Sequence, residues 1–93
     1  MNTPEIRVDC PDALKFAIAE KAKERFRGAG YDIIDVDGVR VKFPDGWGLI
    51  RASNTQPVLV MRFEATTPEK LAEYRGVVER VLEEVTREVE ASA

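Results

Sequence analysis

The residues best suited to chemistry in this chain lie in the segment 51–57, which has the sequence Arg-Ala-Ser-Asn-Thr-Gln-Pro. The guanidinium of Arg51 offers a rigid, planar set of donors that can bind two phosphate or carboxylate oxygens at once. Ser53 and Thr55 can each donate a hydroxyl hydrogen, and consecutive loop N–H groups can form a concave nest for an anion. Asn54 is one of the few non-glycine residue types that tolerate a positive φ, which such a nest often requires. The segment therefore suits recognition of a compact anion, and a phosphate monoester fits it best.

The same residues also suit a turn that binds nothing. Serine, asparagine, threonine and proline are common in turns, and an arginine at the end of a strand is usually just solvated. Composition alone favours this plain turn over a binding loop. In either case catalysis is poorly supported, because Ser53 has no histidine, lysine or carboxylate close in sequence to activate its hydroxyl.

Two strand-like runs position the segment. Residues 47–51 lead into it, and residues 58–65 lead away from it. In the second run Leu59, Met61 and Phe63 occupy alternate positions, so they share one face of the strand, and we expect that face to meet the core. The chain must reverse direction between the two runs, so the polar segment is expected to form the connecting loop.

Three further strands are predicted. Residues 5–10 alternate polar and apolar side chains, as in a half-buried strand, and residues 31–36 and 39–43 form two more runs. The pair Asp37-Gly38 is a strong hairpin signal, and Pro44-Asp45-Gly46 marks the next turn. Neither Asp-Gly pair is accompanied by the additional carboxylates that a Mg²⁺ or Ca²⁺ site needs, so we interpret both as turns rather than metal loops.

An amphipathic helix is predicted over residues 12–27. Its apolar side recurs at every fourth residue, as Leu14, Ile18, Ala22 and Phe26. Its polar surface is expected to include Lys15, Glu20, Lys23 and Glu24. Start signals are Pro11, near the first helical position, and Asp12, at the positive end of the helix. Stop signals are Gly28 and Gly30.

A second helix is predicted to begin at Thr67 and Pro68, as N-cap and first helical residue. Its apolar stripe follows steps of three and four residues, as Leu71, Tyr74, Val78, Val81, Val85 and Val89. We expect this stripe to pack on the sheet rather than to form a coiled coil, and the residues after Val89 to fray.

The predicted order is therefore β-α-β-β-β-β-α. An antiparallel sheet with two helices on one face is the α+β arrangement that buries these apolar faces. Residues 1–93 are expected to form a single domain, with residues 1–4 as a hinge or simply the start of the chain and residues 90–93 as a frayed tail.

The composition is that of a small globular domain, with 93 residues, a net charge of −3 and a hydrophobic fraction of 44%. The negative charge argues against a nucleic-acid partner. No run is apolar enough for a membrane partner and no signal-peptide pattern opens the chain, so a cytoplasmic location is expected. The lone Cys10, in line with Ile6 and Val8, is expected to be a buried structural thiol.

Residues 46–55 have the sequence Gly-Trp-Gly-Leu-Ile-Arg-Ala-Ser-Asn-Thr, and they are followed by Pro57-Val58-Leu59 and Arg62-Phe63-Glu64-Ala65. This run resembles the phosphate-binding loop of the α-D-phosphohexomutases and is most similar to their bacterial phosphomannomutase/phosphoglucomutase branch. Pro4-Glu5-Ile6 and the runs 15–18 and 37–41 resemble the same enzymes. The resemblance covers most of the chain but only the last of the family's four domains.

The resemblance implies a TATA-binding-protein-like α+β fold. In the family, this domain closes over a sugar phosphate held between all four domains, and the enzyme interconverts hexose 1- and 6-phosphates through a bisphosphate that reorients in the site. By position, Arg51, Ser53, Asn54 and Thr55 match the family's contacts to the phosphate that is not transferred. Many members have Gly at the position of Asn54 and Glu at that of Gln56, so the resemblance assigns no role to the Gln56 side chain.

In the family, the other three domains supply the phosphoserine, the Asp-rich loop that holds Mg²⁺ and the loop that contacts the sugar hydroxyls. None of these motifs occurs in this sequence. The chain alone is therefore expected to be inactive and to hold no metal or cofactor, while Mg²⁺ and a hexose 1,6-bisphosphate are implied for the parent enzyme. Its expected partners are a hexose phosphate and the other three domains. Two hypotheses stay open: the substrate-phosphate-binding C-terminal domain of a phosphomannomutase/phosphoglucomutase, or a free-standing phosphate-binding or interaction module without catalysis.

Overall fold

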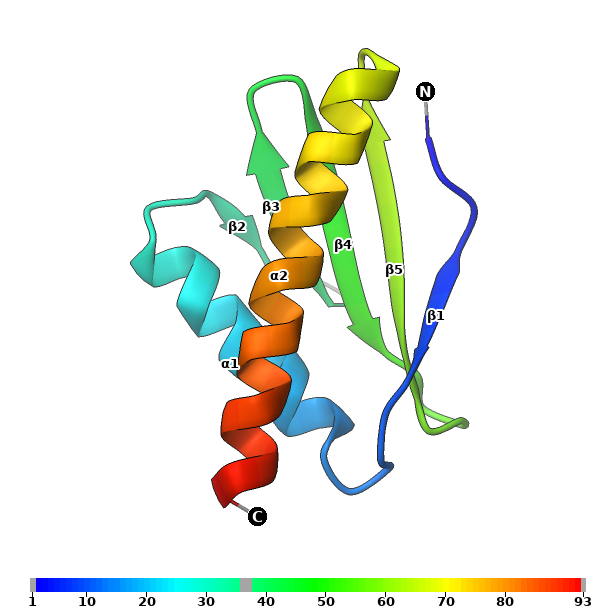
Figure 1. The fold of residues 1–93 in the computed structure, drawn as a ribbon, viewed down its shortest axis with the longest axis vertical. Helices are drawn as coiled ribbons and strands as arrows, with labels where there is room; N and C mark the ends of the chain where they lie inside the picture. Colours follow the sequence, from blue (N-terminus) through cyan, green and yellow to red (C-terminus); the bar gives the residue numbers. More distant parts are fainter. Residues whose placement is uncertain (1, 36–37, 93) are drawn as a thin grey trace.

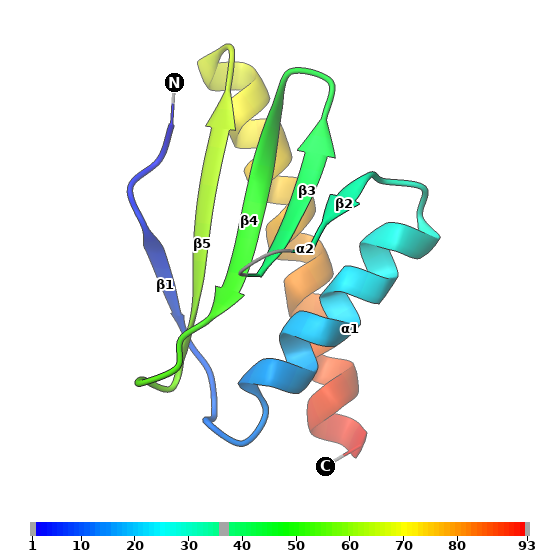
Figure 2. The same ribbon diagram turned by 180° about the vertical axis from the view of Figure 1, so that it is seen from behind.

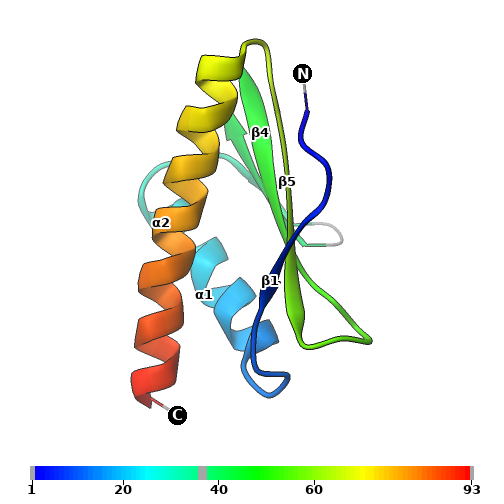
Figure 3. The same ribbon diagram turned by 45° about the vertical axis from the view of Figure 1, so that its right-hand side comes forward.

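The computed structural model describes residues 2–35 and 38–92. These residues form β1 (Ile6–Asp9), α1 (Lys15–Gly28), β2 (Ile33–Ile34), β3 (Val39–Phe43), β4 (Gly46–Ala52), β5 (Val58–Ala65) and α2 (Pro68–Ser92). The five strands build one antiparallel sheet in the order β1-β5-β4-β3-β2. Both helices lie on the same side of this sheet (Figures 1 and 3). The predicted element order and the α+β class are confirmed.

Strand β5 has a hydrogen-bonded neighbour along each edge. Its pairing with β4 runs from Gly46↔Ala65 to Ala52↔Leu59. Its other edge pairs with β1, which comes from the opposite end of the sequence, and Val60 is matched there with Arg7. This arrangement brings the end of β1 beside the polar segment that precedes β5, since Asp9 is matched with Val58.

The core lies between the two helices and the side of the sheet that faces them, to which β3, β4 and β5 all contribute. Leu59, Met61 and Phe63 are each at most 1% exposed and share the helix-facing side of β5, as predicted. The helices contribute Ile18, Ala22, Phe26, Tyr74, Val78, Leu82 and Val85. The predicted stripe of α2 packs against the core, with Leu71, Val81 and Val89 partly buried, but it lacked Leu82, which is buried. A straight helix turns once per 3.6 residues, so its buried face drifts from a heptad pattern over several turns.

Helix α1 starts later than predicted, at Lys15. The carbonyl of Pro11 accepts hydrogen bonds from the N–H groups of Leu14 and Lys15, at 2.9 and 3.1 Å. Pro11 therefore closes a turn ahead of the helix and does not occupy its first position. Asp12 likewise lies before the helix, where its carboxylate pairs with the Lys15 ammonium at 2.6 Å.

The end of α1 agrees with the glycine signals. Gly30 has a φ of 92°, which favours glycine. Its N–H donates to the Arg27 carbonyl, and the N–H of Tyr31 donates to the Phe26 carbonyl, both at 3.1 Å. This pair of bonds is a Schellman motif, which satisfies carbonyls that would otherwise lack partners at the helix end.

Helix α2 begins as predicted. The hydroxyl of Thr67 accepts a hydrogen bond from the Lys70 N–H at 3.1 Å, which identifies Thr67 as the N-cap. Helical residues continue to Ser92, one turn beyond Val89. Fraying of that last turn stays a prediction. No helix in the described part of the chain is both long and apolar enough to cross a membrane.

The region around β2 is only partly described. The strand covers Ile33–Ile34, which is shorter than the predicted run over residues 31–36. The predicted Asp37-Gly38 hairpin falls in part on residues 36–37, which lie outside the described residues. Gly38 itself has a φ of 121°, and a Cβ there would lie 2.7 Å from the Ile50 carbonyl oxygen, so this position requires glycine.

Two glycines allow a matched test of the sheet. A Cβ at Gly46 would lie 2.0 Å from the Glu64 carbonyl oxygen, whereas a Cβ at Gly76, inside α2, would meet nothing within 4 Å. We expect Gly46→Ala to lower the free energy of unfolding by about 1–3 kcal/mol, because the backbone of β5 must move. Gly76→Ala should raise it by about 0.5–1 kcal/mol through helix propensity.

The measurement is urea denaturation of the 93-residue chain, followed by circular dichroism. A single cooperative transition of the unmodified chain is also expected, since residues 1–93 are predicted to fold as one domain. A Gly46→Ala variant as stable as the unmodified chain would contradict the close approach of β4 to β5.

Candidate functional site

The predicted anion-binding segment forms a tight loop, residues 53–57, between β4 and β5. The Ser53 N–H donates to the Val58 carbonyl at 3.1 Å, and the Val58 N–H donates to the Gln56 carbonyl at 2.8 Å. The hydroxyl oxygen of Ser53 accepts hydrogen bonds from the N–H groups of Thr55 and Gln56, at 3.3 and 3.2 Å. The loop is thus ordered by bonds within itself as well as by the hairpin.

Because of these bonds, the hydrogen-bond donors left for a ligand differ from those expected from the sequence. The expected anion nest would use consecutive backbone N–H groups, but those of Thr55 and Gln56 are directed to Ser53. The Ser53 oxygen acts as acceptor in both bonds, so its own hydrogen remains for a ligand. The donors on offer are therefore mainly side chains, from Arg51, Ser53, Asn54 and Thr55.

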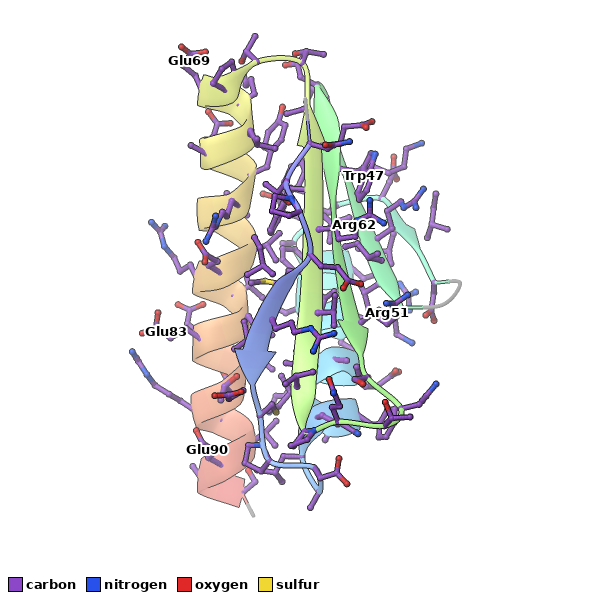
Figure 4. The ribbon with its side chains drawn as sticks, turned by 90° about the vertical axis from the view of Figure 1, so that its right-hand side faces the viewer. Trp47, Arg51, Arg62, Glu69, Glu83 and Glu90 are labelled. Carbon is purple, nitrogen blue, oxygen red and sulfur yellow. The ribbon has the colours of Figure 1, made fainter. Side chains whose placement is uncertain are left out.

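The four predicted residues lie together at one end of the sheet. Arg51, Asn54 and Thr55 are exposed and Ser53 is half-buried. They line an open cleft of about 820 Å³, to which α1 contributes Phe16, Ala19 and Glu20. Seen from behind, the start of α1 lies beside the end of β4 that leads into the loop (Figure 2). Arg51 lies on the side of the sheet away from α2, together with Trp47 and Arg62 (Figure 4).

A second arginine lies beside the loop, and sequence reasoning missed it. Arg7 on β1 and Arg51 on β4 are both matched in register with Val60 on β5, so they flank the same residue on the face of the sheet away from the helices. The Nη1 of Arg7 donates to the Gln56 Oε1 at 2.9 Å. Alternation along residues 5–10 could have placed Arg7 on the polar face, but only the pairing of β1 with β5 brings it to the loop.

Arg51 already has a carboxylate partner within the chain. Its Nη2 lies 3.3 Å from the Oε1 of Glu5, and the two side chains are 47% and 43% exposed. An ion pair this exposed is screened by water and holds Arg51 only weakly. A doubly charged phosphate could replace Glu5 at the guanidinium without a large loss.

Lys15 was predicted to lie on the polar surface of α1, and this prediction is wrong. Its side chain is only 3% exposed, and its Nζ donates to the Gln56 carbonyl at 3.1 Å. Lys15 lies three residues before the buried Ile18, so it shares the buried face of α1, and its ammonium finds partners there in Gln56 and Asp12. Gln56 is therefore contacted by two cations: Arg7 binds its side chain, and the buried Lys15 binds its carbonyl.

Cys10 is a buried thiol, as predicted. Burial raises its pKa, the nearby Glu90 carboxylate raises it further, and Lys15 partly offsets both. Its backbone N–H donates to the Pro57 carbonyl at 2.9 Å, so β1 continues its pairing up to the end of the loop.

The Asp45-Gly46 pair acts as a turn. The Tyr74 hydroxyl lies 3.1 Å from the Asp45 N–H and 3.5 Å from its Oδ2, which ties the turn to α2. Within residues 2–35 and 38–92, no group of three histidine, cysteine, aspartate or glutamate side chains could hold a metal ion.

The fold and the loop define a small α+β domain that presents one polar loop at the end of its central hairpin. Residues 5–87 match the family described as "Phosphoglucomutase/phosphomannomutase, C-terminal domain". The chain belongs to this family, since the match spans nearly all of its elements.

Whole proteins of this kind are similar over most of the chain. The phosphomannomutase/phosphoglucomutase of Pseudomonas syringae pv. tomato is 42% identical over 90 residues, which are 97% of this chain and 19% of that protein. The Pseudomonas aeruginosa protein of the same name is 46% identical over 85 residues, 91% of this chain and 18% of that protein. A phosphoglucomutase of Neisseria meningitidis serogroup B is 43% identical over 86 residues, 89% of this chain and 18% of that protein.

A solved structure agrees. The crystal structure of a phosphoglucomutase/phosphomannomutase family protein from Burkholderia thailandensis superimposes with a TM-score of 0.67 at 34% identity, covering 91% of this chain and 18% of that one. The chain thus spans less than a fifth of the length of these relatives.

The environment of Cys10 predicts that its thiol reacts slowly with alkylating reagents. Burial and a raised pKa both lower the amount of accessible thiolate, which is the reactive form. We expect alkylation by iodoacetamide at pH 8 to be at least about tenfold slower in the folded chain than in guanidinium. Because the pKa of Cys10 is raised, the alkylation rate of the folded chain should keep rising at pH values above the usual pKa of a cysteine thiol. Equal rates in both conditions would mean that the end of β1 opens readily.

Proposed function

We propose that this chain is the substrate-phosphate-binding C-terminal domain of a phosphomannomutase/phosphoglucomutase. Arg51, Ser53, Asn54 and Thr55 contact the non-transferred phosphate of a hexose phosphate. The observation that carries the proposal is the loop itself, which brings a guanidinium, two hydroxyls and an amide to one exposed edge of the cleft. Membership in the family and the names of the relatives support it.

Two arginines at the loop favour an anion. Arg51 and Arg7 flank Val60 on the face of the sheet away from the helices. The cleft is also lined by the carboxylates of Glu5, Glu20 and Asp35, of which Glu20 and Asp35 are paired with Lys23. Glu5, which forms an ion pair with Arg51, is exposed, so it can move into water when a phosphate binds. Binding then exchanges a weak internal ion pair for a charge-assisted, bidentate one.

We infer that this chain supplies only part of a catalytic site, since it spans 19% of such a protein. A metal used by the whole enzyme, and the second phosphate of a hexose 1,6-bisphosphate, would then bind in other domains. We therefore infer that the chain binds and orients substrate while the remaining four-fifths of such an enzyme supply the chemistry.

The other domains are the inferred macromolecular partners. One loop covers little of a sugar phosphate, so the bound phosphate stays in contact with water. When further domains close over it, water is excluded and each charge-assisted bond becomes stronger. A cytoplasmic location and a TATA-binding-protein-like description of the fold stay predictions.

In the isolated chain, we expect weak binding at the loop. Titration with glucose 6-phosphate should shift the backbone amide signals of Ser53, Asn54 and Thr55 more than any others. The apparent Kd should be weaker than ~1 mM, which corresponds to only about 4 kcal/mol. Largest shifts on the outer faces of the helices would instead favour an interaction module with an inert turn at residues 53–57.

In an enzyme that contains this chain as its C-terminal domain, Arg51→Ala should lower kcat/KM about 10- to 100-fold, the cost of losing a hydrogen bond to a charged group. Arg51→Lys should recover only part of the loss, because an ammonium cannot form the bidentate fork. The matched control is Arg62→Ala, an exposed arginine on the same face but away from the loop, which should change kcat/KM by about twofold at most. Equal effects of Arg51→Ala and Arg62→Ala would contradict the proposed site.

A further inference from the structure

We propose that Lys15 is a positioning residue for the phosphate loop: its buried ammonium holds the Gln56 carbonyl and thereby orders the side chains that bind phosphate. The expected effect of Lys15 on phosphate binding rests on the proposed function. The effect of Lys15 on the order of the loop does not, and it can be tested without any ligand.

The first argument is the burial of the charge. In the described part of the chain, Lys15 is the one charged or polar residue in the buried class, at 3% exposure. Burying an ammonium is costly unless its hydrogens find partners. Lys15 has two such partners, the Asp12 carboxylate at 2.6 Å and the Gln56 carbonyl at 3.1 Å. Its Nζ also lies 5.3 Å from the centre of the Phe16 ring. An arrangement this specific fixes the place of the ammonium.

The second argument is the place of Gln56 in the loop. Its carbonyl accepts from the Val58 N–H as well as from Lys15, and its N–H donates to the Ser53 hydroxyl oxygen. Holding the carbonyl of Gln56 therefore limits rotation of the peptide groups around it. The Ser53 hydroxyl is held by the Gln56 N–H, so its position depends on the orientation of these peptide groups. The position of Thr55 depends on it too, because the Thr55 N–H donates to the same hydroxyl oxygen.

The third argument separates Lys15 from Arg7. Arg7 also reaches Gln56, but it binds the side-chain Oε1 at an exposed position. A bond to an exposed side chain constrains the loop backbone less than a bond from a buried group to a carbonyl. Loss of Lys15 should thus disturb the loop more than loss of the Gln56 side chain. Since Asp12 partly neutralises the ammonium, we assign Lys15 the role of ordering the loop rather than attracting the phosphate.

The experiment compares Lys15→Met, which keeps the length of the side chain and removes its donors, with Lys21→Met as matched control. Lys21 is on the same helix but pairs with Glu88 on α2, away from the loop. Backbone ¹⁵N relaxation without ligand should show increased motion at Ser53, Thr55 and Gln56 in Lys15→Met only. Lys15→Arg should restore part of the order, and Gln56→Ala should disturb it less than Lys15→Met. Unchanged relaxation of the loop in a folded Lys15→Met chain would overturn the proposal.

Titration with glucose 6-phosphate adds the functional readout. The apparent Kd should rise about 3- to 10-fold in Lys15→Met, as expected for one lost hydrogen bond, and stay unchanged in Lys21→Met. If the unmodified chain shows no shifts at the loop, the proposed function fails, while the relaxation data still decide whether Lys15 orders the loop. An ordered loop in Lys15→Met with unaltered affinity would overturn the inference and leave the proposed function standing.

A measurement on the unmodified chain covers the case in which Lys15→Met does not fold. The ammonium of Lys15 should give a slowly exchanging ¹⁵Nζ signal with a scalar coupling across the hydrogen bond to the Gln56 carbonyl carbon. An ammonium that exchanges rapidly with water and shows no such coupling would overturn the proposal.

Discussion

The pairing of β5 with β4 on one edge and β1 on the other is the constraint on which the rest of this structure depends. The β4 pairing sets the ends of the loop, since Ala52 is opposite Leu59. The β1 pairing brings Arg7 and Cys10 to the same place, although they are some fifty residues away in sequence. Once β5 is held on both sides, its alternation sends Met61 to the core and Val60 to the opposite face of the sheet, between Arg7 and Arg51. One face of β5 thus packs in the core, and the other lies beside the candidate site.

The face of the sheet away from the helices carries Arg7 and Arg51, although the chain has a net charge of −3. The acidic side chains of α2, such as Glu83 and Glu90, lie on the far side of the sheet from Arg51 (Figure 4). Several of them form ion pairs with α1 or along α2 itself, as Glu88 does with Lys21. The sheet separates these α2 carboxylates from the arginines, whereas Glu5, Glu20 and Asp35 line the cleft beside Arg51. The charge at the loop is therefore set by these neighbours rather than by the net charge of the chain.

Local patterns were sufficient for most of the fold. The hairpin β4–β5, the glycine end of α1 and the Thr67 cap each depend on a few neighbouring residues, so their sequence signals were reliable. The sequence signal for the start of α1 was not reliable. Proline is common at the first helical position, but here the carbonyl of Pro11 closes a turn ahead of the helix. Likewise, the deeper burial of Leu82 than of Val81 depends on how α2 lies across the sheet, which periodicity does not encode.

By itself, the sequence determined that this is an α+β domain with a polar loop carrying Arg51, Ser53, Asn54 and Thr55, because strand alternation and turn chemistry are local properties. Only the tertiary structure decided what surrounds the loop. The Arg7 contact depends on the pairing of β1 with β5, and the Lys15 contact on where α1 starts relative to the hairpin. Both contacts join residues more than forty positions apart, and a lysine that a helical pattern places at the surface becomes buried when another segment supplies partners for its ammonium.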